Sequence, residues 1–87
     1  MESRDLVLEL GRTIDSPIGN LLIAWVGHRR GQSVDMTISE SGGPSKRQCI
    51  PLGEEMRFAS KTGAEFELRF MRSEGDWRGH FRLTQLN

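Results

Sequence analysis

Apolar and polar residues alternate along most of the chain with a period of two. Leu6, Leu8 and Leu10 occupy every second position near the beginning, and residues 33–39 and 65–70 repeat the pattern. Such alternation is typical of a β-strand that has one face on a hydrophobic core and the other in water. No stretch of ten or more residues has apolar positions at the spacing of an amphipathic helix. The sequence therefore predicts an all-β protein.

Segments rich in glycine, proline and serine interrupt the alternation at about the 8–12-residue spacing of small β-sandwiches and barrels. We predict a single domain spanning residues 1–87, with seven antiparallel strands in a small sandwich or a partly open barrel. The predicted strands are residues 5–12, 20–28, 33–40, 46–52, 55–60, 65–72 and 77–86.

The last two predicted strands form a hairpin whose register follows from its turn. If Glu74 and Gly75 form a two-residue loop, three pairs share the inner face. These pairs are Phe66 with Leu83, Leu68 with Phe81, and Phe70 with Gly79. A slip of one residue would set the apolar side chains against polar ones, so it is disfavoured. On the outer face, Glu67 then lies opposite Arg82, a pair that contributes about 0.2–1 kcal/mol.

Residues 21–26 break the alternation, because all six are apolar. Leu21, Ile23 and Trp25 fall on one face, and the other face consists of Leu22, Ala24 and Val26. A domain this small buries only about 60–65% of its unfolded surface, so it has few layers with which to cover both faces. We therefore expect one face to contact another molecule, with a homodimer as the default. The pattern leaves open which face is the core.

Two tryptophans and one arginine are the candidate anchors for a protein partner. Trp and Arg are enriched among the residues that dominate binding energy at interfaces. Trp25 lies in the all-apolar segment, and Trp77 precedes Arg78 in the last predicted strand. We predict a non-enzymatic protein-binding module (a small standalone adaptor, inhibitor or assembly subunit) that uses Trp25, Trp77 and Arg78. Core packing is the alternative role for each tryptophan.

Nucleic-acid binding by a small β-barrel is the alternative function. Arg69, Arg78 and Arg82 form one outward-facing stripe on the last hairpin, where they would contact phosphates. The phenylalanines of the same strands point to the opposite face, so they offer bases no stacking surface beside the arginines. Twelve Lys and Arg balance twelve Asp and Glu, which gives a formal net charge of zero. Nucleic acid is therefore the less favoured partner.

The sequence contains no motif that fixes a reaction, a metal or a cofactor. His28 and His80 stand apart, and no motif places a nucleophile or an orienting acceptor beside either of them. Cys49 is interpreted as a half-buried structural cysteine. Residues 42–47 combine glycine, serine and cations, but they lack the spacing and the following helix of a phosphate-binding loop. We expect no enzymatic activity, no metal and no cofactor.

The beginning of the chain predicts a cytoplasmic protein. Charged residues continue to Asp5 and return at Glu9, without the apolar run of a secretory signal. The longest apolar run has six residues, whereas a membrane span needs about 20, so no membrane contact is expected. The one cysteine cannot form an internal disulfide and is expected to remain reduced.

Overall fold

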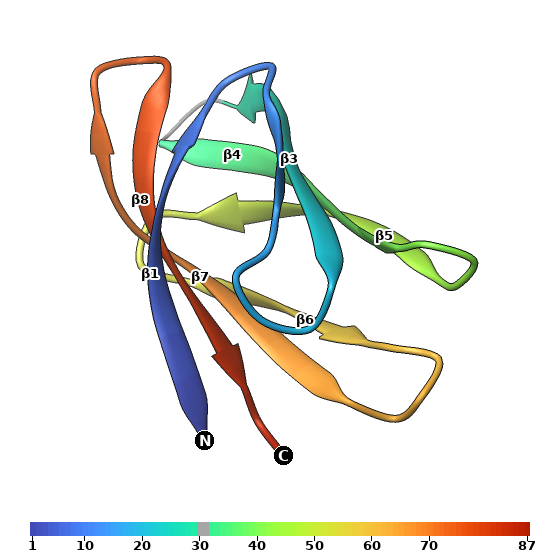
Figure 1. Cartoon of the computed structure of the whole chain (residues 1–87). Helices are drawn as coiled ribbons and strands as arrows, with labels where there is room; N and C mark the ends of the chain where they lie inside the picture. Colours follow the sequence, from blue (N-terminus) through green and yellow to red (C-terminus); the bar gives the residue numbers. More distant parts are fainter. Residues whose placement is uncertain (30–31) are drawn as a thin grey trace.

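The computed structural model describes residues 1–29 and 32–87. Within these residues the chain forms eight strands, and no helix is present that is long and apolar enough to cross a membrane. The strands are β1 (Glu2–Glu9), β2 (Thr13–Asp15), β3 (Leu21–Arg29), β4 (Ser33–Glu40), β5 (Ser45–Pro51), β6 (Glu55–Ala59), β7 (Glu65–Glu74) and β8 (Arg78–Gln85) (Figure 1). The all-β prediction is confirmed.

The predicted number of seven strands is wrong, because the sequence pattern did not reveal β2. This strand has three residues and pairs with β3 only from Thr13 to Asp15. Three residues are too few to display an alternation, so the segment falls in the predicted connection between residues 12 and 20. The remaining strands differ from their predicted bounds by a few residues at their ends.

The strands form two four-stranded antiparallel sheets with the orders β1-β8-β7-β6 and β2-β3-β4-β5. The sheets face each other, and the chain crosses between them after β1 and again after β5 (Figure 1). This arrangement is a small sandwich, one of the two predicted architectures. Among the described strands, β1 and β6 are the edges of the first sheet, and β2 and β5 are the edges of the second.

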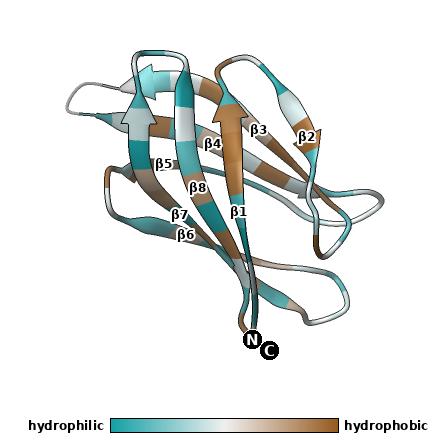
Figure 2. Cartoon of the chain, turned by 60° about the vertical axis from the view of Figure 1, so that its left-hand side comes forward, coloured by the Kyte–Doolittle hydropathy of each residue, from teal (hydrophilic) through white to brown (hydrophobic). Residues whose placement is uncertain are grey.

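The core lies between the two sheets and is formed by alternate residues of the longer strands. Hydrophobic and hydrophilic bands follow one another along these strands (Figure 2). Its largest side chains are those of Trp25, Phe66, Phe70 and Phe81, each 1% exposed. The rings of Phe70 and Phe81 stack with centroids 5.0 Å apart, and Trp25 meets Phe81 edge to face at 6.1 Å. The contact of Trp25 with Phe81 joins the two sheets, since Trp25 belongs to one and Phe81 to the other.

The predicted register of the last hairpin is wrong by two residues. Phe66 lies opposite Gln85, Leu68 opposite Leu83, and Phe70 opposite Phe81. Two features cause the shift: the turn comprises residues 75–77, and the ladder skips a residue between Phe70 and Arg72. Because the shift is even, the same side chains still point inward.

Two predicted pairs of that hairpin change with the register. Glu67 lies opposite Thr84 rather than Arg82, and Phe70 lies opposite Phe81 rather than Gly79. A Cβ placed on Gly79 would nonetheless approach the Phe81 ring to 2.9 Å and the Phe70 ring to 3.3 Å. Aromatic rings therefore do cover this glycine, although not by the predicted pairing.

Candidate functional site

The structure settles which face of β3 belongs to the core. Ile23 is fully buried, and Leu21 and Trp25 are each 1% exposed. On the opposite face, Leu22 is 41% and Val26 is 45% exposed. We call Leu22, Ala24 and Val26 the β3 outer face. Apolar surface in the middle of a sheet is the feature that the sequence pattern predicted, and the described residues leave Leu22 and Val26 exposed.

The surroundings of the β3 outer face are small and polar. Across the ladder to β4, Leu22 lies opposite Ser39 and Ala24 lies opposite Thr37. The ladder skips a residue between Trp25 and Gly27, so Val26 occupies a β-bulge. A bulge re-aims the side chain at its position and sharpens the local twist. The apolar stripe therefore stands between shorter polar neighbours and is accessible to a flat partner surface.

Charged groups lie beside this stripe on the same sheet. Asp35 is 6% exposed, and one of its carboxylate oxygens lies 3.5 Å from Nη2 of Arg47. Cys49 is paired with Asp35 across the β4–β5 ladder and is exposed, so the prediction of a half-buried cysteine is wrong. The outward residues of edge strand β5 thus put polar and cationic groups on the same face of the sheet as the apolar stripe, with β4 between them.

Of the three predicted anchors, the structure brings two together and separates the third. Trp77 lies in the turn before β8 and is 52% exposed, with the Arg78 guanidinium carbon 4.6 Å from its ring centroid. Such stacking of a cation on an exposed ring contributes about 0.5–1 kcal/mol. Trp25 is in the core, where its indole N–H donates to the carbonyl oxygen of Gly27 at 2.9 Å. Trp77 and Arg78 are therefore surface groups, whereas Trp25 has the core role that was its alternative.

The three arginines of the predicted phosphate-binding stripe are each paired with carboxylates. Arg69 lies 3.2 Å from Glu55 and 3.4 Å from Glu67, and it also donates to the carbonyl oxygen of Gly53. The partners of Arg78 are Glu9 at 3.4 Å and Glu74 at 3.8 Å. Arg82 donates through Nε to Asp5 at 2.9 Å. Phosphates would have to compete with these carboxylates, so the geometry favours nucleic-acid binding less than the sequence pattern did.

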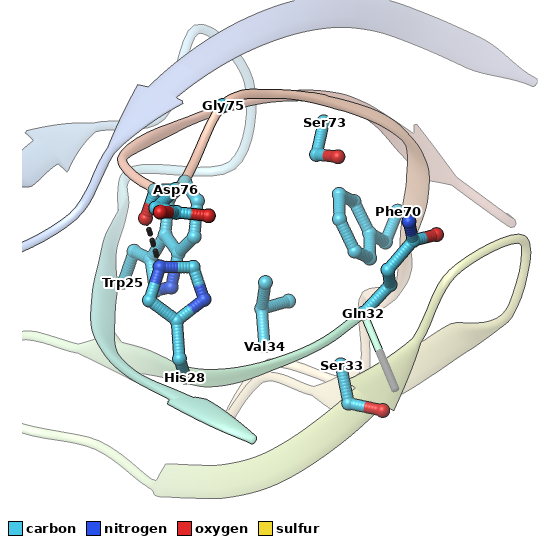
Figure 3. Close-up of a pocket in the computed structure, with 9 residues that line it drawn as sticks. All are labelled: Trp25, His28, Gln32, Ser33, Val34, Phe70, Ser73, Gly75 and Asp76. Carbon is cyan, nitrogen blue, oxygen red and sulfur yellow. Dashed lines mark hydrogen bonds between the residues drawn. The ribbon is translucent and has the colours of Figure 1, made fainter. Parts of the chain in front are cut away.

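A pocket of about 430 Å³ opens at one end of the sandwich, between the β3–β4 end and the β7–β8 turn (Figure 3). Its floor is formed by Trp25, Val34 and Phe70, each at most 2% exposed. At the rim, the His28 ring is hydrogen-bonded to the backbone carbonyl oxygen of Asp76, a contact that joins the two hairpin ends. A small molecule in this pocket would meet polar groups at the rim and apolar side chains at the floor.

The second histidine also has a specific partner. His80 Nε2 lies 2.5 Å from a carboxylate oxygen of Glu74 on the neighbouring strand. This hydrogen bond, together with the charges of His80, Arg72 and Arg78, holds the pKa of Glu74 below its ordinary 4.5. In the described part of the chain, His, Cys, Asp and Glu side chains do not gather in a group of three or more that could hold a metal ion.

Sequence reasoning did not single out Val7, which is an exposed apolar residue on the outer face of the other sheet. Val7 is 53% exposed in edge strand β1, and Met71, which lies at the β7 bulge, is 40% exposed. Val7 had a readable signal, because it is an apolar residue at an outward position between Asp5 and Glu9. Met71 had the same signal, because the alternation of Phe66, Leu68 and Phe70 already places residue 71 on the outward face.

Comparisons with protein-family models, with curated proteins and with solved structures find no match to this chain.

Proposed function

We propose that this protein is a non-enzymatic protein-binding module that associates with a second copy of itself through the β3 outer face. One observation carries the proposal: Leu22 and Val26, at 41% and 45% exposure, flank Ala24 on a strand with a paired neighbour on each side. Such a stripe differs from scattered surface apolar residues, because it is contiguous and central in its sheet. Its role would be that of an adaptor, inhibitor or assembly subunit.

A second copy is the favoured occupant because the stripe is self-complementary. In a two-fold dimer the same patch contributes from both sides, so apolar residues meet apolar residues. Covering the exposed part of Leu22 and Val26 contributes about 1 kcal/mol for each side chain. Association costs at least about 4 kcal/mol, so the polar remainder of the face must also contribute. We therefore expect a dimer of micromolar rather than nanomolar affinity.

The alternative, nucleic-acid binding through Arg69, Arg78 and Arg82, receives less support. Each of these arginines already has a carboxylate partner within 4.0 Å. The exposed pair of Trp77 and Arg78 supports protein binding better, since aromatic and arginine side chains are common interface anchors.

Backbone-amide NMR spectra across a dilution series map the association surface. The amides of residues 22–26 and of their β4 partners should shift with concentration, and those of β1 should not. Val26→Arg should abolish the shifts by placing a charge in the apolar stripe. Val7→Arg is the matched control, because Val7 has similar exposure on the other sheet. Concentration-dependent shifts that are confined to residues outside the β2-β3-β4-β5 sheet would overturn the proposal.

A further inference from the structure

The free edge of β1 is the longest stretch of edge backbone with unpaired groups that the described residues leave open. β1 has eight residues and pairs with β8 on one side only. Leu10 N donates to Trp77 O at 2.8 Å in continuation of this ladder. Hydrogen-bonded residues alternate along an antiparallel strand, so the even-numbered residues of β1 bond to β8. The main-chain groups of the odd-numbered residues, 3 to 9, therefore point away from the sheet.

Most of these outward groups have no partner among the described residues. The carbonyl oxygen of Ser3 accepts from the Arg4 guanidinium at 3.0 Å, and that of Glu9 accepts from Arg12 N at 3.1 Å. The N–H and C=O of Asp5 and Val7 remain, together with the N–H groups of Ser3 and Glu9. These donors and acceptors lie at the two-residue repeat that a further β-strand would match.

The other edge strands, β2, β5 and β6, are shorter than β1, and β5 and β6 are also protected against the addition of a further strand. β2 has three residues. In β6, the carbonyl oxygens of Arg57 and Glu55 accept hydrogen bonds from Lys46 and Gln48 of β5 at 2.8 and 3.5 Å. β5 itself carries two cations and ends at Pro51, which are common devices against strand addition. In β1, by contrast, the middle of the edge exposes Val7.

The charges beside this edge specify the chemistry of the added strand. The odd-numbered residues of β1 place Ser3, Asp5, Val7 and Glu9 on the outer face. One oxygen of Asp5 binds Arg82 of β8, and the Asp5 side chain is 76% exposed. A neighbouring strand would meet the carboxylate of Asp5, which has one arginine partner, and that of Glu9, which lies 3.3 Å from Arg12 and 3.4 Å from Arg78. The added strand would match β1 if it placed cationic side chains opposite Asp5 and Glu9 and an apolar side chain opposite Val7.

We infer that the edge of β1 accepts an extended segment of another protein, with Lys or Arg two residues on either side of an apolar residue. The inference rests on the proposed function as a protein-binding module, but it uses a different surface from the β3 outer face. A second copy of this chain fits less well, because an antiparallel β1 would put Ser3, Asp5, Val7 or Glu9 opposite Asp5, and none of these is a cation.

The test uses two fluorescein-labelled synthetic peptides and measures binding by fluorescence anisotropy. The first is Thr-Lys-Thr-Val-Thr-Lys-Thr, whose symmetry sets lysines beside Asp5 and Glu9 in either chain direction. The second has glutamate in place of both lysines. We expect the lysine peptide to bind at least about tenfold more tightly, which corresponds to about 1.4 kcal/mol. No binding of the lysine peptide at about 1 mM, or equal binding of both peptides, overturns the inference.

Variants of β1 separate strand addition from general attraction. Val7→Pro removes an outward N–H without breaking the ladder to β8, so the fold should persist while peptide binding is lost. Val7→Thr keeps the N–H and should bind within about threefold of the wild type, as expected for a side chain that is 53% exposed. Asp5→Lys should abolish the preference for the lysine peptide, because each peptide then meets one like and one opposite charge at positions 5 and 9, and it carries the test if Val7→Pro fails to fold. Unchanged binding by folded Val7→Pro contradicts strand addition.

Self-association through the β3 outer face and peptide binding at the β1 edge can be disrupted independently. Val26→Arg should lose self-association and keep peptide binding, whereas Val7→Pro should keep self-association and lose the peptide. Loss of both properties in Val26→Arg while the protein stays folded would show that the peptide binds to the dimer interface and not to the β1 edge.

Discussion

Ile23 and Ala24 are neighbours in β3, yet their side chains lie on opposite faces of the sheet. Ile23 is fully buried in the core, and Ala24 lies on the β3 outer face beside Thr37 of β4. The same chemical change at these two positions therefore has two different consequences.

Replacing Ile23 with arginine should unfold the domain, whereas Ala24→Arg should leave it folded. An unpaired buried charge costs several kcal/mol, which is a large part of the roughly 5–15 kcal/mol that stabilises a typical domain. At position 24 the guanidinium can reach water. Far-UV circular dichroism and thermal melting distinguish the two cases. A cooperative melt for Ile23→Arg at the wild-type temperature would show that the core face is assigned wrongly.

Gly19→Ala should destabilise the protein more than Gly63→Ala. Both glycines have positive φ, 81° and 89°, a conformation that costs other residues about 1–2 kcal/mol. At Gly19 a Cβ would also come within 2.4 Å of the buried Phe66 ring, whereas at Gly63 it would meet nothing within 4 Å. Overpacking adds about 1–3 kcal/mol at Gly19. Urea unfolding of the two variants checks the difference, and equal losses would contradict the packing of residue 19 against Phe66.

The alternation along the chain was sufficient to predict the all-β class and most inward-facing residues. Phe66, Leu68 and Phe70 point inward because a period of two fixes the face of each residue once the strand is known. The register was not predictable, because the turn at residues 75–77 shifts the pairing by three residues and the bulge at Met71 takes one back, and neither leaves a hydrophobic signature. Strand β2 was missed because three residues cannot show a period.

The candidate sites were predicted unevenly for related reasons. The all-apolar run of residues 21–26 predicted that β3 has an exposed apolar face. Which of the two faces packs inward depends on the tertiary arrangement. Trp25 and Trp77 are chemically alike, and only the fold distinguishes the buried one from the exposed one. Glu55, which pairs with Arg69, and Asp5, which pairs with Arg82, come from other strands, so their neutralising effect could not be read from local spacing; only Glu67, the second partner of Arg69, lies nearby in the sequence.

The contact between His80 and Glu74 predicts a dependence of stability on acid pH. The pKa of Glu74 is lowered in the folded protein, first by its hydrogen bond with His80. Its stabilising contribution is therefore fully present above the ordinary 4.5 and is lost as the pH falls through the lower folded-state pKa. NMR titration of the Glu74 carboxyl carbon should show a rise towards the ordinary value in His80→Ala. His28→Ala is the control, and an equal response in both variants would refute the assignment.

Nucleic-acid binding should be weak at physiological salt, because the arginine stripe is already neutralised. We expect no micromolar complex with random-sequence DNA or RNA in a filter-binding or anisotropy assay. If a complex does form through the stripe, replacing Arg69, Arg78 and Arg82 with glutamine should flatten its salt dependence by about 0.9 log–log units per lost phosphate contact. A micromolar wild-type complex with that behaviour would favour the alternative function over protein binding.

Sedimentation equilibrium of the wild-type protein at about 100 µM tests the central claim most directly, because a micromolar dimer is largely assembled at that concentration. The association proposed for the β3 outer face predicts a mass near twice that of one chain, which returns to the mass of one chain in Val26→Arg but not in Val7→Arg. A wild-type protein that sediments as a clean monomer at this concentration would contradict self-association and leave Leu22 and Val26 as ordinary exposed residues.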